Sequence, residues 1–297
     1  MNKIAVIGAG TMGNGIAHVF AQHGFSVSLV DLQTSQLEKA LATISINLER
    51  QIKKGLLTSE EKINLMQRIQ PVPEIPEGVR DAGLIIEAAT ENEKIKLSIF
   101  QELDRHAPAQ AILASNTSSI SITKLAGVTR RPSRVIGMHF MNPVPVMKLV
   151  EVINGYATEQ KVTEEIMELS RKLGKTPCLV QDYPGFISNR ILMPMINESI
   201  LSLQEGVATV EAIDTVMKLG MAHPMGPLQL ADFIGLDVCL AILQVLQQGF
   251  GQPKYAPATL LVNMVAAGRL GIKTGEGFYV YNKASKDLVV SEKFRRF

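Results

Sequence analysis

The sequence predicts an α/β fold, in which a doubly wound Rossmann-type sheet domain with a helical hairpin insertion precedes a mainly α-helical domain. Short apolar runs alternate with helical patterns through the first part of the chain, which is typical of a sheet covered by helices on both faces. After Asp182-Tyr183-Pro184-Gly185 the periodic segments become long and helical instead. We therefore expect one domain at residues 1–182 and a second at residues 183–297.

The first elements of the predicted sheet lie between Lys3 and Asp31. An apolar run at Lys3–Ile7 leads into the glycine-rich turn Gly8–Gly13, and a helical pattern over Asn14–His23 follows. A second apolar run, Val27–Val30, ends at Asp31. The order strand, turn, helix, strand predicts a βαβ unit.

A long helical pattern from Ser35 to Gln70 comes next and is interrupted at Lys54-Gly55, where glycine can end a helix. Thr58 then begins the sequence T-S-E-E, which is typical of a helix start. These signals predict two antiparallel helices that project from the sheet. Prolines at positions 71, 73 and 76 indicate a loop after them.

The alternation of strand and helix signals then resumes until residue 181. Strands are expected at Leu84–Ala88, Ala111–Ala114, Val135–His139, Leu149–Ile153 and Cys178–Gln181, and helices at Lys94–His106 and Glu159–Leu173. In the second domain, helices are expected at Phe186–Gly206 (with a kink at Pro194), Val210–Leu219, Leu228–Gln248 and Ala256–Ala267, and a strand at Phe278–Tyr281.

The composition is that of a globular protein with little net charge. Hydrophobic residues make up 46% of the chain and charged residues 20%, and the formal net charge is +2. So small a charge creates no field that would recruit nucleic acid or a membrane surface. No apolar stretch reaches the ~18 residues of a membrane helix, and no secretory signal is visible. Cys178 and Cys239, far apart in apolar runs, favour reduced, buried thiols. We expect a cytoplasmic protein, with a processed mitochondrial form left open.

The turn Gly8-Ala9-Gly10-Thr11-Met12-Gly13 has the spacing G-x-G-x-x-G between a strand and a helix, with Asp31 about 20 residues on. Gly8 permits the tight turn, Gly10 lets the backbone approach a pyrophosphate, and Gly13 lets helix and strand pack closely. Asp31 can accept hydrogen bonds from ribose hydroxyls, and no Arg follows at 32–34 to receive a 2′-phosphate. The pattern favours NAD over NADP, with FAD and a turn without ligand as alternatives.

Polar residues follow the later strands, where an α/β sheet faces its ligands. His139 ends one predicted strand, and Ser118 lies in the polar segment Ser115–Ser119 after another. Glu151 interrupts an otherwise apolar strand, and pairing with His139 would fix the histidine tautomer. Asn189 lies near the start of the first helix of the second domain. For each residue the alternative is a structural role, such as helix capping by Ser115–Ser119.

At this point the chain resembles the short-chain L-3-hydroxyacyl-CoA dehydrogenases, including the bacterial 3-hydroxybutyryl-CoA dehydrogenases. The resemblance runs from Lys3 to Tyr281 and is carried by ordered blocks rather than by the glycine motif alone. These blocks are GAGTMG at 8–13, EAATENEKIK at 87–96, ASNTSS at 114–119, GMHFMNPVPVMKLVEVI at 137–153, DYPGFISNR at 182–190, HPMGPLQLADFIGLD at 223–237 and KTGEGFY at 273–279.

The resemblance implies a role for each matched residue. His139 matches the catalytic base and Glu151 the carboxylate that pairs with it, while Ser118 and Asn189 match polar contacts of the reacting oxygen and the thioester. The implied cofactor contacts are Gly8, Gly10, Thr11, Met12, Gly13, Asp31, Glu91, Lys96, Ser118, Asn142 and Lys273. Lys54 in the hairpin matches a contact of the CoA moiety, whereas Asn47 stands where some members carry a CoA-contacting Ser.

The implied activity is NAD-dependent oxidation of L-3-hydroxyacyl-CoA to 3-ketoacyl-CoA, and the reverse reduction, without a metal. The resemblance also implies an NAD-binding domain at 1–182 and a substrate-binding and dimerisation domain at 183–297, with an acyl-CoA and a second copy of the chain as partners. Two alternatives stay open at this point. One is a β-hydroxyacid dehydrogenase acting on a free acid, and the other is a non-enzymatic, crystallin-like NAD-binding protein.

Overall fold

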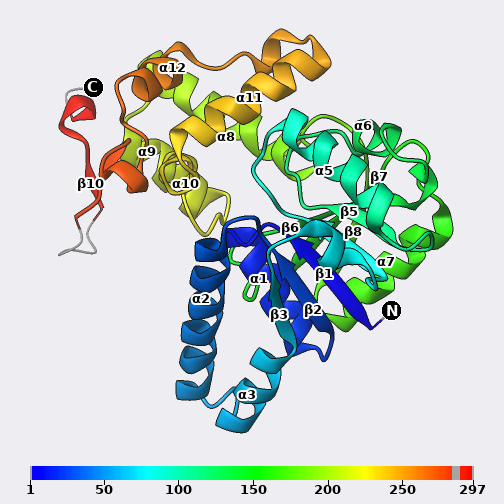
Figure 1. The fold of residues 1–297 in the computed structure, drawn as a ribbon. Helices are drawn as coiled ribbons and strands as arrows, with labels where there is room; N and C mark the ends of the chain where they lie inside the picture. The colour runs from blue at the N-terminus through cyan, green and yellow to red at the C-terminus, as the bar shows by residue number, and fades with distance from the viewer. Residues whose placement is uncertain (1, 283–287, 296–297) are drawn as a thin grey trace. The chain divides into compact units, whose positions relative to one another are not determined.

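A computed structural model describes residues 2–282 and 288–295, which fold as two compact units, Met1–Tyr183 and Pro184–Phe297. The first unit is a Rossmann-like α/β domain and the second is mainly helical (Figure 1). The predicted fold class is therefore confirmed.

The sheet of the first unit has eight strands in the order β3-β2-β1-β4-β5-β6-β7-β8. Their bounds are β1 Lys3–Ile7, β2 Ser26–Val30, β3 Ile69–Val72, β4 Leu84–Glu87, β5 Ile112–Ser115, β6 Val135–Phe140, β7 Leu149–Asn154 and β8 Thr176–Gln181. The order reverses after β1, because the chain first builds β2 and β3 on one side and then β4 on the other. Such a switch point is where open α/β sheets bind ligands, at the carboxyl ends of the strands.

One pair of strands departs from the predicted parallel arrangement. β6 and β7 pair antiparallel, with His139 directly opposite Glu151. The connection between them spans only residues 141–148, which is too short for the helical crossover that a parallel pair needs. The direction of β7 thus follows from the length of this connection.

Helices cover both faces of the sheet. They are α1 Thr11–Gln22, α2 Thr34–Lys53, α3 Ser59–Gln67, α4 Ile75–Val79, α5 Glu93–His106, α6 Ile122–Gly127 and α7 Gln160–Lys172. Apolar side chains of α1, α2 and α7 join alternate strand residues, such as Ile4 and Val6, in one buried core. The residues between them point to the other face because side chains alternate along a strand.

The hairpin insertion consists of α2 and α3, which project from the sheet in Figure 1. A capping box fixes the start of α3: the Thr58 hydroxyl accepts the Glu61 N–H, and the Glu61 carboxylate accepts the Thr58 N–H. The loop expected around the three prolines is wrong in part. Pro71 lies inside β3, a strand that extends the sheet beyond β2, and Pro76 lies in the first turn of α4, where a missing N–H breaks no helical hydrogen bond.

In the second unit the helices are α8 Ser188–Gln204, α9 Val210–Thr215, α10 Pro227–Ile234, α11 Leu236–Phe250 and α12 Thr259–Ala266, with a π-helical turn at Val216–Gly220 after α9. β9 Tyr279–Val280 pairs with β10 Val289–Val290, a strand that the sequence patterns did not predict. The apolar faces of these helices and strands enclose a separate core, which includes Met193, Leu243 and Phe278.

Two further expectations need correction. The single helix predicted over 228–248 is broken at Gly235, whose φ of 103° is accessible to glycine, so α10 and α11 meet at a bend of 97°. In the described ranges no single helix is long and apolar enough to span a membrane, although this bent pair passes by length and composition. Cys178 is exposed on the edge strand β8, whereas Cys239 is buried as expected.

Candidate active site

The Gly8–Gly13 turn has the geometry of a phosphate-binding turn. Gly8 adopts φ 101°, and a Cβ on Gly13 would lie 1.7 Å from the Gly8 carbonyl oxygen. A Cβ on Gly10, by contrast, would meet nothing within 4 Å. The first turn of α1 has no side-chain cap and no acidic residue, so its backbone N–H groups and the helix dipole favour an anion there.

Asp31 follows β2 and closes this turn. Its carboxylate accepts the Ala9 N–H at 2.8 Å and the Gln33 N–H at 3.0 Å. Beside it lies a cavity of about 490 Å³ with apolar walls that include Ile75, Ile95 and Ile99. An apolar slot next to a fixed carboxylate suits a flat base and a ribose, so the residues present fit the adenosine part of NAD.

The antiparallel pair β6–β7 places His139 and Glu151 side by side. The His139 Nδ1 lies 2.7 Å from Glu151 Oε2, and the Glu151 side chain is fully buried. Both residues alternate with core-facing neighbours, so they share one face of the sheet near the carboxyl end of β6. The predicted pairing of the two residues is present in the structure.

Glu91 gathers the segment that follows β5. Its Oε1 accepts the hydroxyls of Thr117 at 2.6 Å, Ser119 at 2.9 Å and Ser118 at 3.1 Å. The N–H groups of Ser118 and Ser119 point to the same oxygen. Burial alone would raise the pKa of Glu91, but the Lys96 charge and these hydrogen bonds outweigh it and hold the pKa below its ordinary value. Ser118 is thereby fixed beside an ionised carboxylate.

A buried ion pair that the sequence patterns did not predict supports this arrangement. The fully buried Glu87 carboxylate accepts Lys96 Nζ at 2.6 Å, the Ser115 hydroxyl at 2.7 Å and the Ala89 N–H at 2.7 Å. Lys96 Nζ also lies 3.4 Å from Glu91 Oε2. Lys96 is only 1% exposed, so it is placed to influence a ligand through Glu91 rather than by contacting the ligand itself. A carboxylate inside the apolar strand Leu84–Glu87 was the available signal.

Asparagines connect the strand ends around His139. Asn116 Oδ1 accepts the Phe140 N–H at 2.9 Å, which ties the end of β5 to the end of β6. Asn142 is exposed in the connection after β6, where a cis peptide bond joins it to Pro143. The first unit thus gathers the glycine turn, Asp31, Glu91, Ser118, Asn142 and the His139–Glu151 pair along the carboxyl edge of one sheet.

The three remaining predicted residues belong to other elements of the chain. Lys54 is exposed at the end of α2, in the hairpin. Asn189 is buried in the first turn of α8, and Lys273 pairs with Asp237 across the start of α11. Asn189 and Lys273 belong to the second unit.

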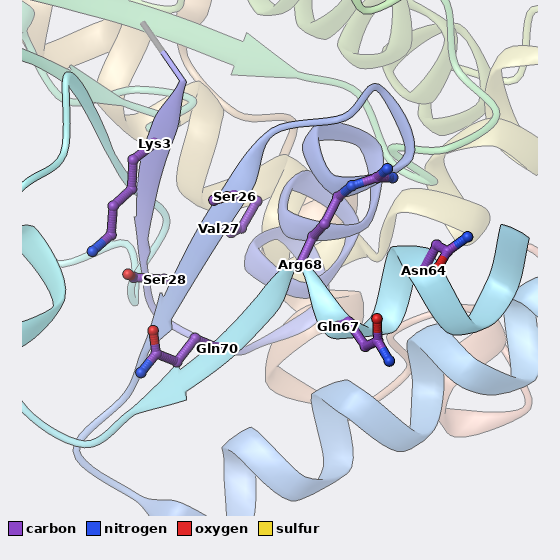
Figure 2. Close-up of a pocket in the computed structure, with 8 residues that line it drawn as sticks. All are labelled: Lys3, Ser26, Val27, Ser28, Asn64, Gln67, Arg68 and Gln70. Atoms are coloured by element: carbon purple, nitrogen blue, oxygen red, sulfur yellow. The ribbon is translucent and has the colours of Figure 1, made fainter.

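A hollow of about 360 Å³ lies at the opposite edge of the sheet, between the amino ends of β1–β3 and α3 (Figure 2). The side chains of Lys3 and Arg68 point in different directions there. Lys3 Nζ lies 3.4 Å from Asp81, and the Arg68 guanidinium donates to the Ala21 carbonyl at 3.2 Å. These cations serve the fold, and the hollow gathers no group for chemistry.

Comparison with known proteins identifies the family. The NAD-binding domain model of the 3-hydroxyacyl-CoA dehydrogenases matches residues 3–183, and the model of their C-terminal domain matches residues 185–281. The chain belongs to the 3-hydroxyacyl-CoA dehydrogenase family. The resemblance inferred from the sequence is therefore confirmed, and with it NAD as the cofactor of the first unit.

Individual relatives match almost the whole chain. A 3-hydroxybutyryl-CoA dehydrogenase of Bradyrhizobium diazoefficiens is 54% identical over 284 residues, which cover 96% of this chain and 97% of the relative. A probable 3-hydroxybutyryl-CoA dehydrogenase of Bacillus subtilis is 52% identical, over 95% of this chain and 98% of the relative. The crystal structure of (S)-3-hydroxybutyryl-CoA dehydrogenase from Ralstonia eutropha superposes with a TM-score of 0.93 at 50% identity, covering 95% and 100% of the two chains.

Proposed function

We propose that this protein catalyses the NAD-dependent oxidation of short-chain L-3-hydroxyacyl-CoA, with 3-hydroxybutyryl-CoA as substrate, and the reverse reduction of 3-ketoacyl-CoA. The observation that carries the proposal is the His139–Glu151 pair at the carboxyl edge of a sheet that also holds the glycine turn. Family membership and relatives near 50% identity support the substrate class.

In this proposal His139 is the catalytic base. An ionised carboxylate only accepts hydrogen bonds, so Glu151 makes His139 Nδ1 the donor and leaves Nε2 to exchange a proton with the substrate hydroxyl. The buried carboxylate then stabilises the imidazolium that forms. In the reduction the imidazolium returns the proton to the ketone oxygen.

When bound, NAD would supply the hydride acceptor for the carbon that bears the hydroxyl group. The chain's own contribution is to hold and orient. The N–H groups of the Gly8–Gly13 turn bind the pyrophosphate, Asp31 accepts the ribose hydroxyls, and the Glu91 network fixes the Ser115–Ser119 segment. Ser118 and Asn189 contact the substrate, Lys54 the CoA moiety, and Asn142 and Lys273 the cofactor, as the resemblance implies.

An absorbance assay of NADH oxidation tests this function. We expect rapid turnover with acetoacetyl-CoA, slower turnover with longer 3-ketoacyl-CoA esters, and none with free acetoacetate. Activity on the free acid alone would contradict the proposal and favour a β-hydroxyacid dehydrogenase. Tight NADH binding without any turnover would favour the non-enzymatic alternative.

We also propose that the protein is a homodimer joined through its second unit. Exposed apolar side chains cluster around a hollow of about 380 Å³ between α8 and α9, among them Val207 and Val216. Patches of this kind mark protein–protein contacts. Sedimentation at micromolar concentration should give the dimer mass, and a monomer mass would contradict this.

The bacterial relatives support the predicted cytoplasmic location, which cell fractionation would test.

A further inference from the structure

Lys175 is a buried cation that forms no ion pair with a carboxylate of the described residues. It lies in the turn between α7 and β8 and is 7% exposed. Its ammonium donates to the carbonyl oxygens of Val144 at 2.5 Å and Met147 at 2.7 Å. A buried ammonium is costly unless its donors are satisfied, so these two bonds fix where both carbonyls can lie.

The carbonyls belong to residues 141–148, the connection between β6 and β7. Inside this connection, the N–H groups of Val146 and Met147 bond back to the Pro143 carbonyl. From outside the connection, the Thr176 N–H donates to the Lys148 carbonyl at 2.8 Å. Lys175 and the first residue of β8 therefore hold the connection at three of its carbonyl oxygens.

The same connection packs against α1. Val144 is buried, and a Cβ on Gly15 of α1 would lie 2.9 Å from the Val144 Cβ. His18, on the same helix, is fully buried, and its burial, together with the weaker effect of the nearby Lys175 charge, lowers its pKa to about 4. Burial lowers the pKa of Lys175, and the charge of the nearby Lys148 lowers it further. Lys175, the connection and α1 thus form one packed contact.

We infer that Lys175 is a positioning residue, which holds the 141–148 connection against α1 and so fixes Asn142 and the His139 end of β6 relative to the Gly8–Gly13 turn. It acts through main-chain carbonyls and touches neither substrate nor cofactor. The inference rests on the proposed function, because Asn142 and the glycine turn are taken there as the two ends of one cofactor site.

The test is the variant Lys175→Met, which keeps the aliphatic stem and removes the donors. We expect its Kd for NADH, measured by fluorescence titration, to rise about tenfold and its kcat to fall by a similar factor, since two charge-assisted hydrogen bonds are lost. Lys175→Arg restores a charged donor and should recover most of both values. Lys172→Met is the matched control, because Lys172 is exposed on α7 and pairs only with Glu168 in the described residues.

A Lys175→Met protein with a lower melting temperature but wild-type NADH affinity and kcat would overturn the inference and reduce Lys175 to a structural role. If this variant does not fold, Gly15→Ala presses on Val144 from the α1 side and should also raise the Kd for NADH; an unchanged Kd would contradict the inference. A wild-type chain that binds no NADH would contradict the proposed function itself, which is a distinct result.

Discussion

The buried Glu87–Lys96 pair shows how single residues hold the candidate site. Glu87 accepts three donors, from Ala89, Lys96 and Ser115, which come from three different segments. Lys96 also contacts Glu91, which in turn accepts hydrogen bonds from the segment that follows β5. Because neither charge has access to water, each depends on the other.

Glu87→Gln should therefore lower the free energy of unfolding by about 3 kcal/mol, since it leaves the buried Lys96 charge with only the longer contact to Glu91 at 3.4 Å. The double variant Glu87→Gln/Lys96→Met should lose less than the sum of the two single variants, because it removes both charges. Urea denaturation measures all three. Lys124→Met, which breaks the exposed pair with Glu93, is the control and should change stability by less than about 1 kcal/mol. Additive effects would contradict the coupling.

Asp31 determines the choice of cofactor in this proposal. Asp31→Ala should narrow the preference for NAD over NADP, because it removes the negative charge that a 2′-phosphate would meet. The ratio of kcat/KM for the two cofactors measures this. Asp81→Ala, at an exposed carboxylate paired with Lys3, is the control. A ratio unchanged by Asp31→Ala would overturn the ribose contact.

Among single residues, the sequence could predict those that end an apolar run, such as Asp31 and His139, because strand ends face the ligand in such sheets. It could not predict Lys175. The partners of that side chain are main-chain carbonyls 31 and 28 residues away, and no side-chain pattern encodes them. Glu87 left a partial signal, as a carboxylate in an apolar strand, but its three donors are visible only in the folded chain.

In the proposed function, cofactor binding depends on the β1–α1 turn. Gly13→Ala should lower the melting temperature by several degrees and abolish NADH binding, because the new methyl group would overlap the Gly8 carbonyl and push α1 away from β1. Gly10→Ala provides the contrast. Its methyl group meets no protein atom, so stability should stay near wild type while NADH affinity falls at least tenfold.

Calorimetry of the cofactor-free proteins and fluorescence titration with NADH measure the two effects separately. Equal losses of stability in the two variants would contradict the assignment of packing to Gly13 and of ligand approach to Gly10.

Elements with a strong period were predictable, whereas their directions and breaks were not. The apolar runs of β6 and β7 were both expected, but their antiparallel pairing follows from the short connection between them, and it is this pairing that places His139 opposite Glu151. The helical period over 228–248 continues across Gly235, so only the backbone conformation there reveals two helices.

Across the whole molecule, two buried groups respond to acid in opposite senses, one in each unit. Burial lowers the pKa of His18 from 6.5 to about 4, so the stability that it confers is present above pH 6.5 and is lost as the pH falls towards 4. Burial raises the pKa of Asp232 from 3.8 to about 6, against hydrogen bonds from Tyr279, Phe278 and Tyr281. Its contribution is present below pH 3.8 and is lost as the pH rises through 6.

Between pH 7 and pH 5 His18 should therefore destabilise the first unit by about 2 kcal/mol, while Asp232 stabilises the second by about 1 kcal/mol. His18→Gln removes the first contribution, so the free energy of unfolding of this variant, relative to wild type, should rise by about 2 kcal/mol as the pH falls from 7 to 5. Urea denaturation at pH 7, 6 and 5 measures it, with the exposed His23→Gln at the end of α1 as the control. A difference between His18→Gln and wild type that is independent of pH would contradict this.

One measurement tests most directly the proposal that His139 is the base: the turnover and the NADH affinity of His139→Gln, determined on the same preparation. Glutamine keeps a hydrogen-bond partner for Glu151 but cannot take up the hydroxyl proton, so kcat with 3-hydroxybutyryl-CoA should fall by at least about a thousandfold while the Kd for NADH stays near wild type. A variant with wild-type turnover would contradict the assignment of His139 as the base.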